Sequence, residues 1–151
     1  MPDRCPECEA LLPKGGACRD LFHELLVLEA QVPGTAGALT HFYTVACYAL
    51  QHPDSFRYTQ EALVGLHQAL CDALDDQITL EELRRRARAG AARAGRVTRR
   101  PGDPTPVWRR GGWSMRVVDV LSVAPEQYPD TVRRWARSIR DSLAAKELSS
   151  R

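Results

Sequence analysis

Three cysteines near the start of the chain constrain its fold more than any other feature. Cys5 and Cys8 belong to the tetrapeptide CPEC, and Cys18 follows after the tract EALLPKGGA. A Cys-x-x-Cys turn points two thiolates at one ion, and a third thiolate from the start of a helix supplies three of the four ligands that tetrahedral Zn²⁺ prefers. The spacing therefore predicts a zinc-binding loop at the N-terminus. The alternative is a loop that three thiols line without a metal.

The cysteine count and the composition favour reduced thiols in one domain. The chain has 151 residues, of which 44% are hydrophobic, and a domain of this size buries a core without disulfides. Five cysteines with a single C-x-x-C pair favour metal ligation, and no thioredoxin-like βαβ pattern supports a redox role. Cys47 and Cys71 are expected to be core residues. Because no secretory signal or membrane-spanning run is evident, we expect a cytoplasmic protein.

Prolines and the spacing of apolar residues predict four helices in the first part of the chain. Their expected ranges are 18–32, 36–52, 59–74 and 79–94. Pro33 and Gly34 end the first helix, Pro53 ends the second, and Thr79 is a candidate N-cap for the fourth. The first two helices are predicted to form an αα-hairpin.

The composition changes after Gly95. Residues 95–106 carry three prolines and are predicted to form a linker or loop. Residues 107–120 hold two β-favouring runs around Gly111 and Gly112, which predicts a tight β-hairpin. The last helix is expected over 125–146, with an apolar stripe made of Tyr128, Val132, Trp135, Ile139 and Leu143.

These elements predict a mainly α fold in a single domain over residues 1–151. The fold is expected to be a helical bundle built on the αα-hairpin, with an N-terminal zinc-knuckle loop and a small β-hairpin before the C-terminal helix. Its expected parts are a metal-binding loop (1–18), a helical core (18–94), a linker or loop (95–106), and the β-hairpin with the C-terminal helix (107–148).

The geometry of the αα-hairpin identifies a fourth metal ligand. Two antiparallel helices joined near residues 33–36 place Cys18 beside Gln51 and His52. His23 is nearer in sequence, but five residues at ~100° each turn it roughly 140° away from Cys18 around the helix axis. We therefore predict a Cys₃His site made of Cys5, Cys8, Cys18 and His52.

The same hairpin places Glu29 beside Thr40 and His41. His41, Val45, Tyr48 and His52 share one helix face, so both histidines are predicted to point inward. Eleven residues separate the histidines by roughly 16 Å, so they cannot share an ion. The functional interpretation is an acid–base pair, Glu29 and His41, in a pocket with Tyr48 and Gln51.

Two other interpretations of this pair stay open. The interpretation that we favour is an ion pair between Glu29 and His41, which satisfies a carboxylate in an apolar stripe and fixes the hairpin. A second, weaker metal site would use Glu29 and His41 with Asp20 or Glu24, which is a poor supply of ligands.

Charge is divided unevenly along the chain. Residues 1–83 hold four Lys or Arg against thirteen Asp or Glu, and residues 84–151 hold seventeen against six. Ten arginines lie between Arg84 and Arg110, where Asp103 is the only acid. Such a tract suggests phosphate or nucleic-acid binding. We favour neutralisation by the acidic half or a solvated face, because only Trp108 is available there for base stacking.

Four segments of the chain resemble a known family. They are CPECEALLPKGGACRDLFHELLVLE, HFYTVACYALQHP, and WSMRVVDV with the later VRRWARSI. The chain resembles, over nearly its whole length, an uncharacterised family of small bacterial proteins classed as a domain of unknown function. The family pattern implies a role for Cys5, Cys8, Cys18, Glu29, His41, Tyr48, Gln51 and His52. It omits His23 and implies no activity.

Three classes of function compete on this evidence. The first, which we favour, is a zinc-stabilised helical protein that binds a protein partner in an accessory or regulatory role, with an apolar patch expected at Val107, Trp108 and Trp113. The second is a small enzyme built on Glu29, His41, Tyr48 and Gln51, acting on a small molecule. The third is a nucleic-acid binder that uses Arg84, Arg85, Arg86, Arg88, Arg99, Arg100, Arg109 and Arg110. The sequence leaves the oligomeric state open.

Overall fold

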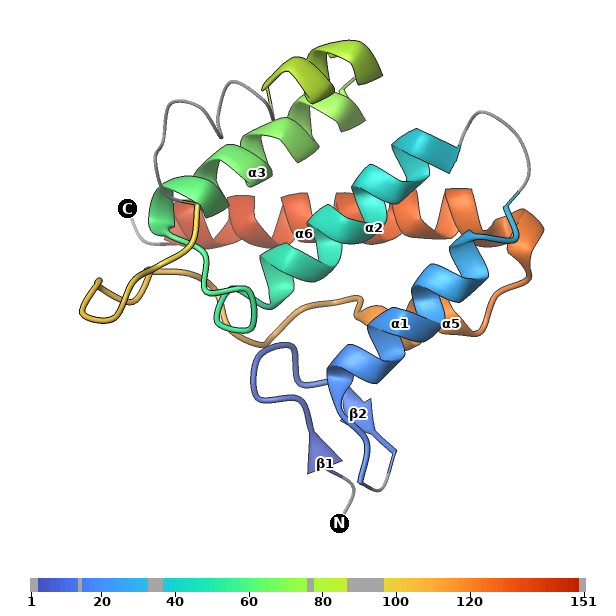
Figure 1. The fold of residues 1–151 in the computed structure, drawn as a ribbon, viewed down its shortest axis with the longest axis horizontal. Helices are drawn as coiled ribbons and strands as arrows, with labels where there is room; N and C mark the ends of the chain where they lie inside the picture. The colour runs from blue at the N-terminus through green and yellow to red at the C-terminus, as the bar shows by residue number, and fades with distance from the viewer. Residues whose placement is uncertain (1–2, 14, 33–36, 76–77, 87–96, 150–151) are drawn as a thin grey trace.

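A computed structural model describes residues 3–13, 15–32, 37–75, 78–86 and 97–149 of the chain (Figure 1). Helices dominate it, and the predicted mainly α fold class is confirmed. In chain order the elements are strands β1 (Asp3–Arg4) and β2 (Leu11–Leu12), helices α1 (Cys18–Glu29), α2 (Gly37–Gln51), α3 (Gln60–Leu74) and α5 (Val117–Leu121), the 3₁₀ helix η1 (Pro125–Gln127) and helix α6 (Tyr128–Ser149). A further helical stretch covers residues 80–86.

Helix α6 organises the helical body. It crosses behind α2 and α3 and packs against both, while α1 packs on α5 (Figure 1). The predicted apolar stripe of α6 is buried throughout, from Tyr128 to Leu143, and Trp135 is fully enclosed. Each such side chain contributes about 1.5–3 kcal/mol by leaving water. The stripe therefore holds α6 in the centre of the core.

Local signals set the helix boundaries largely as predicted. The Thr59 hydroxyl accepts the Ala62 N–H at 3.1 Å and caps α3, and the Thr79 hydroxyl accepts the Glu82 N–H at 3.1 Å, as expected for an N-cap. Helix α2 ends at Gln51, two residues before Pro53. The rest of the helix predicted over 79–94 lies outside the described residues.

The prediction of a β-hairpin over residues 107–120 is wrong. Residues 107–116 form an irregular strap, and α5 begins directly after it. Gly111 and Gly112 do adopt positive φ, but their N–H groups donate to the carbonyl of Glu7 and the carboxylate of Glu9. The glycines therefore turn the strap onto the N-terminal loop, and no partner strand forms.

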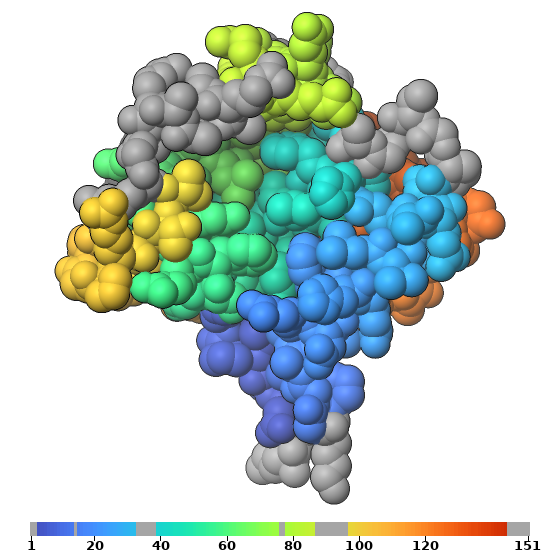
Figure 2. All heavy atoms as spheres, viewed as in Figure 1, coloured from blue at the N-terminus to red at the C-terminus, as the bar shows by residue number. Residues whose placement is uncertain are grey.

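The antiparallel hairpin that does exist lies at the N-terminus. Strands β1 and β2 pair Asp3 with Leu12 and Arg4 with Leu11. They flank the C-x-x-C turn, and the N-terminal segment projects from the helical body (Figure 2). Within the described residues, no helix combines the length and the apolar character that crossing a membrane requires.

Candidate metal centre

The C-x-x-C segment folds into a closed knuckle. The Cys5 N–H donates to the Ala10 carbonyl, and the Glu9 N–H donates to the Cys5 carbonyl, both at 2.9 Å. Glu9 adopts φ +68°, a left-handed conformation that turns the chain back toward β2. Cys5 and Cys8 are buried at 3% and 0% exposure. The knuckle thus directs both thiols into the protein.

Cys18 and His52 complete the cluster from the two helices of the hairpin. Cys18 is the first residue of α1, and its Sγ atom lies 3.9 Å from Sγ of Cys8 and 3.2 Å from Nε2 of His52. The ligand atoms of Cys5, Cys8, Cys18 and His52 all lie within 4.8 Å of one another, and all four residues are buried. The antiparallel pairing expected from the sequence therefore brings the three thiols and this imidazole together.

Hydrogen bonding orients the imidazole toward the thiols. Nδ1 of His52 lies 2.7 Å from the carbonyl oxygen of Tyr48, so Nδ1 carries the proton and donates it there. When the ring is neutral, Nε2 presents its lone pair to the cluster, which is the arrangement by which a backbone carbonyl fixes the tautomer of a metal-binding histidine. The His52 ring stacks on Tyr48 with a centroid distance of 3.9 Å, and Tyr48 stacks in turn on Phe22 at 4.1 Å.

The thiols and the imidazole of this cluster shift one another's pKa values. Hydrogen bonds with Cys18 and Cys8 lower the pKa of the Cys5 thiol, whereas hydrogen bonds with Cys18 and Cys5, together with burial, raise the pKa of Cys8. Burial lowers the pKa of His52, but its hydrogen bonds with Cys18 and Cys5 outweigh burial and raise it to about 9. At neutral pH these shifts favour a protonated Cys8 thiol and a protonated His52 imidazole, and a metal ion bound by the cluster would take the place of those protons.

The donor set fits a metal ion of the zinc type. Thiolate sulfur and imidazole nitrogen are the ligands of structural Cys₃His sites, and four protein ligands leave no open coordination position. In the described part of the chain, this cluster is the only group of three or more Cys, His, Asp or Glu side chains close enough to share an ion. The weaker site suggested for Glu29 and His41 with Asp20 or Glu24 does not assemble among those residues, and Asp20 instead accepts the Ala17 N–H at the start of α1.

Glu7 is a residue of this centre that the sequence analysis missed. It lies between the two knuckle cysteines and is only 8% exposed. Its carboxylate accepts the N–H groups of Asp54 and Ser55, at 2.7 and 3.3 Å, and the hydroxyl of Ser55. No helical or strand periodicity predicts such a contact, and its one signal was an acidic residue inside the C-x-x-C turn.

The strap formed by residues 107–116 closes the knuckle from another side. The Gly111 N–H donates to the Glu7 carbonyl at 3.0 Å, and the Gly112 N–H donates to Oε1 of Glu9 at 2.8 Å. The Arg116 Nε donates to the Cys8 carbonyl at 2.7 Å. The candidate metal centre is therefore embedded between segments far apart in sequence.

The Glu29–His41 pair forms as the hairpin predicts, with Oε2 of Glu29 2.8 Å from Nδ1 of His41. The side chain of Glu29 is 11% exposed, but that of His41 is 57% exposed. The expectation that both histidines point inward is therefore wrong for His41. Helical periodicity fixes the direction of a side chain, whereas burial depends on the elements packed above it.

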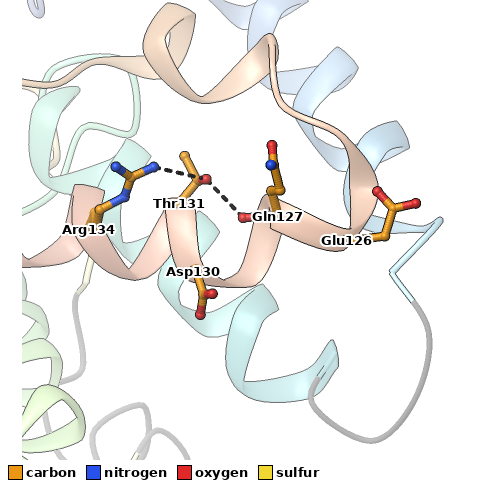
Figure 3. A pocket seen from close by; sticks show the side chains of 5 residues that line it. All are labelled: Glu126, Gln127, Asp130, Thr131 and Arg134. Atoms are coloured by element: carbon orange, nitrogen blue, oxygen red, sulfur yellow. Dashed lines mark hydrogen bonds between the residues drawn. The ribbon is translucent and has the colours of Figure 1, made fainter.

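Tyr48 and Gln51 do not join Glu29 and His41. Tyr48 stacks against His52 at the metal centre, and the Gln51 side chain donates to the Met115 carbonyl at 2.8 Å. A polar surface pocket at the start of α6 contains none of the four residues proposed as catalytic (Figure 3). Its lining residues are Glu126, Gln127, Asp130, Thr131 and Arg134.

Several arginines of the basic tract pair with acids from the first half of the chain. Arg85 contacts Glu82, and Arg86 contacts Asp72 at 2.7 Å and Glu82 at 3.5 Å. Asp54 bridges Arg99 at 3.0 Å and Arg110 at 2.9 Å. These four arginines therefore have acidic partners in the fold. Arg88 lies outside the described residues.

The apolar patch expected at Val107, Trp108 and Trp113 is largely absent. Val107 is 82% exposed, but Trp113 is 2% exposed and Trp108 donates its Nε1–H to the Leu50 carbonyl at 2.9 Å. Both indoles therefore anchor the strap to the protein.

Fold and site together define a helical protein with a candidate Cys₃His metal centre between its N-terminal knuckle and the end of α2. The chain belongs to a family of unknown function, DUF5946, whose family model matches residues 3–144. Nothing among the curated proteins or the solved structures matches it significantly.

Proposed function

We propose that this chain is a zinc protein in which one ion, held by Cys5, Cys8, Cys18 and His52, has a structural role. The observation that carries the proposal is the convergence of four buried donor atoms within 4.8 Å. A site with four protein ligands has no free position for substrate or water, which argues for a structural ion over a catalytic one. A cytoplasmic location would keep the three thiols reduced.

On this proposal the helical body acts as an accessory or regulatory binding module in one domain over residues 1–151. The ion would join the knuckle, α1, α2 and the strap into one rigid unit, because the free energy of metal binding becomes folding free energy. Elemental analysis of purified protein tests the zinc assignment. We expect one zinc per chain, and protein free of transition metal after purification without chelators would contradict the proposal.

A second candidate function is a small enzyme that uses the Glu29–His41 pair. It is favoured by the buried Oε1 atom of Glu29, which has no hydrogen-bond partner among the described residues, because such an atom in a native protein calls for an explanation. The separate locations of Tyr48 and Gln51 weaken it. A fragment screen followed by NMR tests this candidate: ligand-induced shifts centred on His41 would support it, and their absence would favour a structural ion pair.

A further inference from the structure

We propose that Glu7 is a positioning residue of the metal centre, whose carboxylate holds the turn after His52 against the cysteine knuckle. The inference rests on the proposed metal site and adds a residue that is not itself a ligand. Glu7 stands between Cys5 and Cys8 in sequence, and the groups that it binds lie two and three residues after His52.

Both oxygens of the Glu7 carboxylate are engaged by a single turn. Oε1 accepts the Asp54 N–H at 2.7 Å and the Ser55 N–H at 3.3 Å, and Oε2 accepts the Ser55 hydroxyl. A carboxylate that is 8% exposed is strongly disfavoured without such partners. Hydrogen bonds to an ionised acceptor are stronger than those between neutral groups. The contact is therefore a defined link between two segments 47 residues apart.

The link acts on the ligand geometry because it joins the two halves of the site. On one side, the Glu7 backbone is fixed in the knuckle, because the Gly111 N–H donates a hydrogen bond to the Glu7 carbonyl. On the other side, His52 is held at its ring by the Tyr48 carbonyl and at its backbone by the Ala49 carbonyl, at 3.1 Å. These contacts orient the imidazole relative to α2. The Glu7 carboxylate then sets the distance from that end of α2 to the thiols.

Glu9 provides a matched control. It is the neighbouring acidic residue of the same knuckle, and its Oε1 accepts the Gly112 N–H at 2.8 Å. The Glu9 carboxylate contacts the strap, and the Glu9 backbone contacts Arg4 and Cys5. Within the described residues, none of these hydrogen bonds involves the turn after His52. Replacing Glu7 or Glu9 by Gln removes the same charge from the knuckle, but only Glu7→Gln weakens the link to Asp54 and Ser55.

The experiment compares wild-type protein, Glu7→Gln and Glu9→Gln, each loaded with zinc. Competition with a chromophoric chelator measures the zinc affinity, and the visible spectrum of cobalt-substituted protein reports the geometry of the site. We expect Glu7→Gln to bind zinc about 10- to 100-fold more weakly, the usual effect of losing an outer-shell partner. Its cobalt bands should also shift, and Glu9→Gln should match the wild type in both measurements.

Three outcomes would overturn the inference. Equal losses of affinity in the two Gln variants would indicate a general charge effect. Unchanged affinity and cobalt bands in Glu7→Gln, with lower thermal stability, would indicate a purely structural role. If Glu7→Gln does not fold, the variant Ser55→Ala is measured instead, because it removes one of the three hydrogen bonds to the Glu7 carboxylate. An unchanged zinc affinity of Ser55→Ala would refute the positioning role of Glu7. Wild-type protein that binds no metal would instead refute the proposed function.

Discussion

The Sγ atom of Cys18, at the start of α1, lies 3.2 Å from Nε2 of His52, just beyond the end of α2. This contact joins positions 34 residues apart, and it exists because the two helices run antiparallel. It closes the cluster that the knuckle cysteines begin. The N-terminal knuckle, which has few apolar residues of its own to bury, thereby gains a fixed place on the helical body.

Removing a ligand should release the metal and destabilise the protein. We expect Cys5→Ser, Cys8→Ser, Cys18→Ser and His52→Ala each to lose zinc by elemental analysis. At a free zinc concentration about 100-fold above the Kd of the wild type, the free energy of unfolding of each variant should lie about 2.7 kcal/mol or more below that of the wild type. His23→Ala is the control and should keep both zinc and stability. Loss of zinc from His23→Ala with retention in His52→Ala would contradict the ligand assignment.

Acid should release the ion reversibly. Thiolate and imidazole ligands bind metal only when deprotonated, so zinc affinity falls as pH falls and each released ion is replaced by bound protons. Zinc release measured against pH with a chromophoric indicator should coincide with a drop in melting temperature. Chelator at neutral pH should reproduce that drop. A melting temperature that stays constant while zinc leaves would argue against a structural role for the ion.

The Glu29–His41 pair should contribute only modestly to stability if it is structural. His41 is 57% exposed, and ion pairs of this kind typically give about 0.2–1 kcal/mol. A double-mutant cycle with Glu29→Gln and His41→Gln, measured by denaturant unfolding, should return a coupling energy in that range. The coupling should shrink in high salt. A much larger, salt-independent value would point to a buried network beyond this pair.

Gly111 should tolerate a side chain less well than Gly102. Both adopt positive φ, at +78° and +93°, so alanine is strained at either position. A Cβ atom at Gly111 would lie 1.8 Å from Oε1 of Glu9, whereas one at Gly102 would meet nothing within 4 Å. We expect Gly111→Ala to cost about 0.5–1.5 kcal/mol more than Gly102→Ala in thermal unfolding, because the Glu9 side chain must swing away and give up the hydrogen bond from the Gly112 N–H. Equal costs would mean that the strap can move off the knuckle.

Asp54 should limit the affinity of the arginine tract for polyanions. Its carboxylate pairs with Arg99 and Arg110, and these arginines lower the pKa of Asp54, with Arg110 contributing more. We expect wild-type protein to elute early from heparin at low salt and Asp54→Ala to elute later. Strong retention of wild-type protein with a steep salt dependence would instead support nucleic-acid binding.

Some features of this protein were determined by the sequence alone because they depend on short-range physics. The period of apolar residues and the prolines predicted α1, α2, α3 and the buried stripe of α6. The hairpin register predicted both contacts between α1 and α2, from Cys18 to His52 and from Glu29 to His41. Because a helix is rigid and regular, the spacing of residues along it fixes their positions over its whole length. Helix geometry was therefore enough to predict these two contacts.

Other features were decided only by the tertiary structure. The Gly111–Gly112 turn has the local chemistry of a β-hairpin, yet hydrogen bonds to Glu7 and Glu9 draw it onto the knuckle. The exposure of His41 depends on which elements lie above it, and the role of Glu7 depends on a turn far away in sequence. Such contacts bring together irregular segments whose meeting no periodicity encodes, because their positions follow from how the whole core packs.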